Sequence, residues 1–176
     1  MKIMSVLFAV TNSPVLQIFQ ARASRLASER NFNDVRHLRR EATIKNVLLF
    51  AVAVIPAVIF LPVLIRVVFR GGIPDTSLST IYFLFLALIP VHLLMSMEMP
   101  YVQVVIALKQ GKVILRTGIL FIVAYFAFVQ VGYSQFGIYG IPAAMLTAQA
   151  VNIAIYIRHV NRSFKDFRWN SQPVVL

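Results

Sequence analysis

Long apolar segments in this chain alternate with short segments that are rich in lysine and arginine. Of the seventeen basic residues, only Lys2, Arg66 and Arg70 lie outside three blocks. The blocks comprise Arg22, Arg25, Arg30, Arg36, Arg39, Arg40 and Lys45, then Lys109, Lys112 and Arg116, then Arg158, Arg162, Lys165 and Arg168. The apolar segments are about twenty residues long, enough for a helix to cross a hydrocarbon core of roughly 30 Å. The pattern predicts an all-α integral membrane protein.

The positions of the basic blocks also predict an orientation, because short loops rich in Lys and Arg stay on the cytoplasmic side of a membrane. The rule gives about five transmembrane helices in a single helical region, residues 1–176. The predicted spans are about 3–21, 47–68, 79–108, 117–134 and 141–157. The cytoplasmic segments are then 22–46, 109–116 and 158–176, and the outer loops are 69–78 and 135–140. We therefore expect a multi-pass protein of the cytoplasmic (inner) membrane, with its C-terminus in the cytoplasm.

The overall composition excludes an ordinary soluble domain. Hydrophobic residues make up 59% of the chain, whereas soluble domains have about 45–50%. The net charge of +11 could suggest nucleic-acid binding, but the charges lie where membrane topology requires them. The lipid bilayer is therefore the predicted partner, and nucleic acid is not. The chain has no cysteine, so it has neither disulfides nor thiolate metal sites.

The first cytoplasmic segment has helical features of its own. Asn33 is a candidate N-cap for a helix that carries Val35, Leu38 and Ala42 on one face. This pattern favours an amphipathic helix lying at the membrane surface before the second span. Anionic lipid would favour such a segment by about 1 kcal/mol per nearby basic residue. The alternative is a docking site for a cytoplasmic partner.

Two spans contain prolines that predict kinks, since each proline removes a backbone donor inside a helix. Pro56 and Pro62 interrupt the second span, and Pro90 and Pro100 interrupt the third. The first span is unusually polar for a lone helix and is expected to need neighbouring helices. Together with the odd number of spans, this polarity predicts further helices encoded upstream of Met1.

Residues for enzymatic chemistry are not grouped in this sequence. His37, His92 and His159 are scattered, the acidic residues are unpaired, and no glycine-rich phosphate loop occurs. We predict no catalytic residues, no metal site and no cofactor.

Glu98 is the one acidic residue inside an apolar span. It lies about ten residues before Lys109, roughly 15 Å along a helix. A carboxylate at that depth costs on the order of 2.5–3.5 kcal/mol, so it should face a cavity, a partner or a proton. Two interpretations remain open for Glu98. It is either a coupling or substrate residue, or a protonated acid satisfied by a neighbouring helix.

Two more polar features complete the candidate residues. Gln149, Asn152 and Tyr156 recur at helical spacing in the last span. Hydrogen bonds between helices explain this row slightly better than the lining of a cavity. Arg66 lies near the end of its span, where snorkelling to the interface is favoured over contact with substrate.

The order of several short motifs resembles the C-terminal portion of a polysaccharide flippase of the MATE-like (MOP) exporter superfamily. The motifs are Gln17–Arg22, Arg39–Arg40, Phe60–Arg66, Phe69–Gly71, Ala107–Lys112 and Phe136–Ala144. Similar proteins have about twelve or more spans in two bundles, so the chain would supply part of the second bundle. Its partner would be a missing N-terminal bundle or a second copy.

The resemblance implies a function in surface polysaccharide biosynthesis. The chain would translocate, or flip, a prenyl-diphosphate-linked oligosaccharide by alternating access. Glu98, Gln149, Asn152 and Arg66 are the candidate residues for substrate or coupling. The alternatives are a drug/cation antiporter of the same superfamily, or a short membrane scaffold that anchors a polysaccharide-assembly complex without transporting anything.

Overall fold

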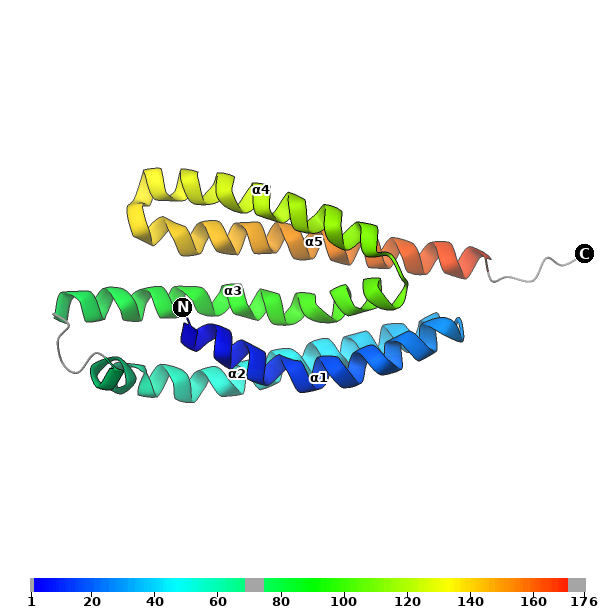
Figure 1. Ribbon diagram of the computed structural model, residues 1–176, viewed down its shortest axis with the longest axis horizontal. Coiled ribbons are helices and arrows are strands. Elements are labelled where there is room, and N and C mark those ends of the chain that lie inside the picture. Colours follow the sequence, from blue (N-terminus) through cyan, green and yellow to red (C-terminus); the bar gives the residue numbers. More distant parts are fainter. Residues whose placement is uncertain (1, 69–74, 171–176) are drawn as a thin grey trace, which may run out of the picture.

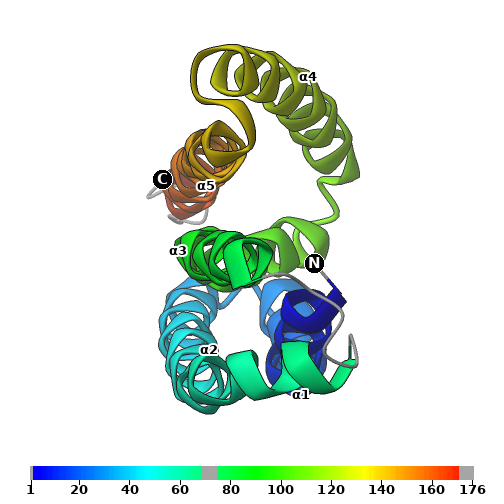
Figure 2. The same cartoon turned by 90° about the vertical axis from the view of Figure 1, so that its left-hand side faces the viewer.

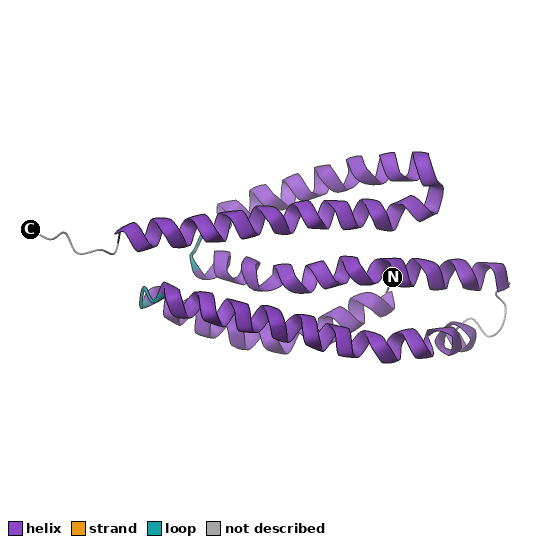
Figure 3. Cartoon of the chain, turned by 180° about the vertical axis from the view of Figure 1, so that it is seen from behind, coloured by secondary structure: helices purple, strands orange, loops and turns teal. Residues whose placement is uncertain are grey.

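The fold is taken from a computed structural model that describes residues 2–68 and 75–170. These residues form helices joined by short turns, and none of them lies in a strand (Figure 3). The elements are α1 (Lys2–Ser28), α2 (Phe32–Val68), α3 (Asp75–Ala107), α4 (Gly111–Phe136), the 3₁₀ turn η1 (Gly137–Tyr139) and α5 (Gly140–Asn170). The prediction of an all-α chain is confirmed.

Three stretches of the described residues are long and apolar enough to cross a membrane. They are Phe32–Val63, Leu78–Ala107 and Gly111–Asp166, the last of which contains both α4 and most of α5. Helix α1 is not among them, in line with the polarity of the predicted first span. These lengths and compositions indicate a membrane protein, and the division into five spans stays a prediction.

The helices run up and down, so that the basic blocks meet at one end of the bundle. The turn from α1 to α2, the turn from α3 to α4 and the C-terminal part of α5 lie together on the right of Figure 1. We call this the basic end. The turn η1 and the start of α3 lie at the other end. Residues 69–74 of the predicted outer loop lie outside the described residues.

Helix α2 begins earlier than predicted, and this corrects the interpretation of segment 22–46. Its N-cap is Asn31, whose Oδ1 accepts a hydrogen bond from the backbone N–H of Asp34 at 3.3 Å, so the prediction of Asn33 as cap is wrong. Val35 and Ala42 are buried inside the bundle. From Phe32 onward the segment is therefore the first part of one continuous packed helix and not a separate helix lying on the membrane surface.

All four predicted kink prolines lie inside helices that continue through them. The last turns of α2 nevertheless leave the axis of the rest of that helix and run across the end of the bundle (Figure 2). This bend fits the loss of backbone hydrogen bonds at Pro56 and Pro62.

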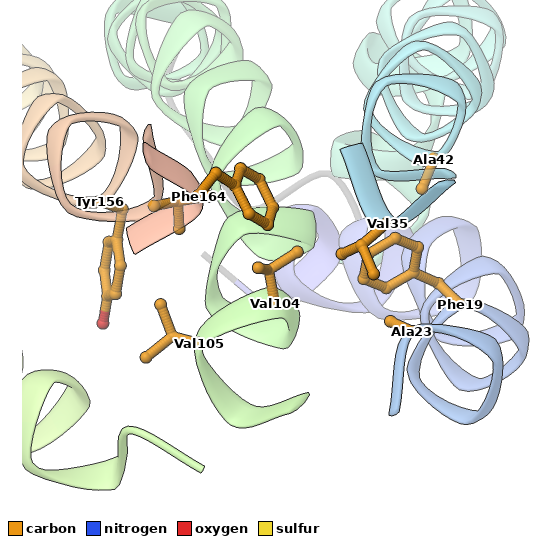
Figure 4. Packing of buried hydrophobic residues seen from close by; sticks show 9 residues of the cluster. Phe19, Ala23, Val35, Ala42, Val104, Val105, Tyr156 and Phe164 are labelled. Atoms are coloured by element: carbon orange, nitrogen blue, oxygen red, sulfur yellow. The ribbon is translucent and has the colours of Figure 1, made fainter. Parts of the chain in front are cut away.

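Two hydrophobic clusters form the core, one at each half of the bundle. The cluster near the basic end contains Phe19, Ala23, Val35, Ala42, Val104, Val105, Tyr156, Val160 and Phe164, drawn from α1, α2, α3 and α5 (Figure 4). The other contains Phe50, Val54, Leu61, Phe85, Leu88 and Val91 from α2 and α3. Along α2 and α3, which contribute to both clusters, buried polar residues separate the two.

Helix α4 reaches the rest of the bundle mainly through α5 (Figure 2). Its one fully buried residue is Thr117, while apolar side chains such as Leu115, Ile119 and Phe126 are exposed. The two helices approach closely at Gly132 and Gly140, where a Cβ built on Gly140 would lie 2.0 Å from the carbonyl oxygen of Gly132. Glycine at both positions permits this backbone contact.

The two turns at the basic end have the same geometry. Arg30 and Lys109 both adopt left-handed conformations, with φ of 56° and 57°. In each turn the next N–H reaches back to the helix, from Asn31 to Leu26 O at 2.9 Å and from Gln110 to Val105 O at 3.0 Å. These are Schellman C-caps formed without glycine.

Candidate functional site

The buried polar residues between the two hydrophobic clusters form the candidate site, which we call the polar layer. Its members are Asn46 on α2, Ser96 and Glu98 on α3, and Gln149 and Asn152 on α5. Each is less than a tenth exposed. On α2 and α3 these residues separate side chains of one hydrophobic cluster from those of the other. The layer therefore crosses the middle of the bundle.

Glu98 is held by two amides from α5. Asn152 Nδ2 donates to Glu98 Oε1 at 2.7 Å, and Gln149 Nε2 donates to Glu98 Oε2. Each carboxyl oxygen thus accepts one hydrogen bond from a buried donor. Three of the four residues predicted for substrate or coupling are brought together here by side-chain contacts.

The spacing along α5 explains how two amides reach one carboxyl group. Gln149 and Asn152 are three residues apart, so they lie on the same face of the helix one turn from each other. Helices α3 and α5 run side by side over this region (Figure 2). Gln149 and Asn152 of the predicted polar row therefore form an interhelical hydrogen-bonding surface whose partner is the acid itself.

This arrangement suits a carboxyl group that gains and loses a proton. When Glu98 is ionised, both amides donate to it, as observed. When Glu98 is protonated, its O–H needs an acceptor, and either amide supplies one by turning its oxygen inward. The amide pair can therefore satisfy both protonation states.

Asn46 is a member of the layer that sequence reasoning missed. It is fully buried, and neither its Oδ1 nor its Nδ2 has a hydrogen-bond partner. It follows Ala42 by four residues and precedes Phe50 by four, and both of those side chains are buried. This helical spacing of buried side chains could have identified Asn46 as a buried residue. It was overlooked because the basic residues of segment 22–46 assigned that segment to the cytoplasm.

A second polar cluster at the basic end was also missed. His159 Nε2 lies 2.8 Å from Gln110 Oε1, and Ser163 Oγ lies 3.4 Å from the same oxygen. The cluster links the turn between α3 and α4 to the C-terminal part of α5. It fixes that turn and does not touch Glu98.

The remaining predicted candidate, Arg66, is not brought into the layer by any described contact. Arg66 belongs to α2 by its backbone, but its side chain lies outside the described residues. His92, a histidine of the same helix as Glu98, stacks on Phe50 with ring centres 6.3 Å apart. Among the described residues, no three His, Cys, Asp or Glu side chains lie close enough together to hold a metal ion.

Comparison of the chain with protein-family models, with curated proteins and with solved structures gives no match.

Proposed function

We propose that this chain is part of a membrane transporter that flips a prenyl-diphosphate-linked oligosaccharide across the cytoplasmic membrane. In this proposal α1 to α5 each span the bilayer once, and the basic end faces the cytoplasm. The observation that carries the proposal is the buried Glu98, held by Gln149 and Asn152 between two apolar clusters. The resemblance to MATE-like polysaccharide flippases supplies the substrate.

A buried acid midway along apolar helices is the feature that a static membrane anchor does not need. Ionisable groups at that depth are rare and mark substrate or proton pathways. A transporter uses such a group because its charge changes on one step of the cycle. Glu98 then serves coupling, and its two amides keep it satisfied in both protonation states.

The proposed mechanism requires a second bundle, since alternating access moves one bundle against another. The exposed apolar face of α4 offers a surface for it. The second bundle is either another part of the same transporter or a second copy of this chain. Arg66 stays a candidate for contact with the diphosphate at the outer half of α2.

A drug/cation antiporter of the same superfamily would use the same acid, with the carboxylate attracting a cationic substrate. A non-transporting scaffold is favoured by a different observation at the basic end. There, α1 and α2 border an open depression of about 460 Å³ lined by Arg22, Arg25, Leu26, Asp34, His37, Leu38 and Glu41. Such a charged surface could anchor a cytoplasmic partner.

The test is made in the natural host, with the gene in its natural context. Deleting the gene should leave lipid-linked oligosaccharide in the cytoplasmic leaflet and deplete surface polysaccharide. The wild-type gene should restore both, and a gene encoding Glu98→Leu should not. Loss of drug resistance with unchanged polysaccharide would favour the antiporter. If the gene encoding Glu98→Leu fully restores the polysaccharide that is lost on deletion, the result favours the scaffold.

A further inference from the structure

Arg39 is a cation at the basic end of the bundle, and no described acidic side chain forms an ion pair with it. Its side chain is half-buried, and its Nε and Nη1 atoms are buried without a hydrogen-bond partner. The guanidinium carbon lies 4.3 Å from the centre of the Tyr101 ring, a cation–π contact between α2 and α3. The ring holds one face of the guanidinium, and it leaves these in-plane N–H donors unused.

The acidic residues nearby are already engaged. In the part of the chain that the structure describes, two ion pairs lie within 4.0 Å, Arg25–Glu29 and Lys45–Glu41. Glu41 is two residues from Arg39 along α2, but its carboxylate lies 2.5 Å from Lys45. Unpaired buried N–H donors on a cation are costly, so an anion from outside the chain is the group that would complete the site.

A second residue with unpaired polar atoms lies on the same face of α2. Asn46 follows Arg39 by seven residues, or two helical turns, about 10 Å deeper into the bundle. It is fully buried, with both amide atoms unpaired. Arg39 and Asn46 thus form a line of unused hydrogen-bonding groups that leads inward from the basic end.

Arg39 and Tyr101 lie about two helical turns inside the basic ends of the apolar stretches Phe32–Val63 and Leu78–Ala107. Tyr101, which it contacts, is near the basic end of the apolar stretch Leu78–Ala107. An arginine in such a place can snorkel towards the interface and bind phosphate through several N–H donors. We propose that Arg39 binds the phosphate group of an anionic ligand between α2 and α3. Phospholipid headgroups and soluble phosphate share this chemistry.

This site is independent of the proposed transport, because Arg39 lies outside the polar layer. A failure of the flipping assay would leave the phosphate site untouched, and a failure of phosphate binding would leave the role of Glu98 untouched. The two proposals therefore need separate experiments.

The experiment uses the purified chain in nanodiscs of phosphatidylcholine. Thermal unfolding and native mass spectrometry are recorded with and without phosphatidylglycerol in the disc, and with and without inorganic phosphate in the buffer. The variant is Arg39→Gln. Its matched control is Arg40→Gln, which removes the same charge from the next residue, whose side chain is exposed.

We expect one of the two phosphate sources to stabilise the wild type and Arg40→Gln, and to bind Arg39→Gln about tenfold more weakly or worse. An effect of phosphatidylglycerol alone identifies a lipid site, and an effect of inorganic phosphate identifies a soluble ligand. If neither source binds the wild type, or if both variants respond alike, the proposal is wrong.

A variant that keeps the charge distinguishes a loss of phosphate binding from misfolding of Arg39→Gln. Arg39→Lys retains the cation but not the multiple donors of a guanidinium, so it should fold and still bind the phosphate more weakly than the wild type. Equal binding by Arg39→Lys and the wild type would show that charge alone attracts the ligand, and would overturn the site.

Discussion

Replacing Glu98 by leucine should destabilise the bundle more than replacing it by glutamine. Leucine removes the acceptor for two buried donors, on Gln149 and Asn152. The oxygen of the new glutamine can accept from Asn152. Gln149 can turn its amide so that its own oxygen accepts from the N–H of the new glutamine. The size and shape of the side chain are also kept by glutamine.

The expected magnitude follows from the number of bonds. Two hydrogen bonds are lost in Glu98→Leu, and each contributes about 0.6–1.5 kcal/mol, the lower figure being typical inside membranes. The free energy of unfolding should therefore fall by about 1–3 kcal/mol. Glu98→Gln should change it by less than about 0.5 kcal/mol if both hydrogen bonds re-form.

A third variant tests whether unsatisfied donors are the cause. Replacing Glu98, Gln149 and Asn152 together by leucine removes the acceptor and both donors. Because deleting all partners of a buried polar contact is nearly neutral, this variant should recover most of the stability lost in Glu98→Leu. It should not recover transport.

The assay combines unfolding in mixed micelles with transport per folded protein in the natural host. Glu98→Gln should keep its abundance while transport falls or loses its pH dependence, since only the titratable charge is gone. Unchanged transport in Glu98→Gln over a wide pH range would end the coupling role. Stability of Glu98→Leu equal to that of the wild type would refute the hydrogen-bond argument.

Three further predictions concern the helices around the site. Gly140→Ala should lower the free energy of unfolding by about 1–3 kcal/mol, because its Cβ would meet the backbone of α4. The control Gly118→Ala should be neutral or stabilising in the same unfolding assay, because a Cβ there meets nothing within 4 Å. Lys109→Gly should be more stable than Lys109→Ala by about 1 kcal/mol, since only glycine relieves the left-handed φ. In intact cells, an impermeant thiol reagent should label a cysteine at Gln135 and not one at Asn33; the reverse result would invert the proposed orientation.

The sequence was sufficient to predict the helices but not where they begin. Alternation of apolar and basic segments correctly predicted an all-α chain and a common end for the basic blocks. The start of α2 was missed because hydropathy averages over all faces of a helix. Arg36 and Arg40 are exposed while Val35 and Ala42 are buried on the opposite face, so a charged segment is also a packed one.

Each residue of the site could be identified from the sequence, but the contact between them could not be predicted. Glu98 was notable as an acid in an apolar span, and Gln149 and Asn152 as a polar row at helical spacing. Their contact depends on how α3 packs on α5, about fifty residues further along the chain. No local pattern specifies that packing. The unpaired atoms of Asn46 and Arg39 were likewise visible only once α2 was placed against its neighbours.

The position of Glu98 suggests how a proton could move helices in the proposed transporter. Helix α4 is attached chiefly to α5, so α4 and α5 form a hairpin that meets α1, α2 and α3 mainly along the α3–α5 contact (Figure 2). The two amide bonds to Glu98 lie in that contact. Protonation weakens them, because hydrogen bonds to a charged acceptor are stronger than those to a neutral one. The hairpin is therefore held more tightly to α3 when Glu98 is ionised, and the weaker contact after protonation is the change that a second bundle could exploit.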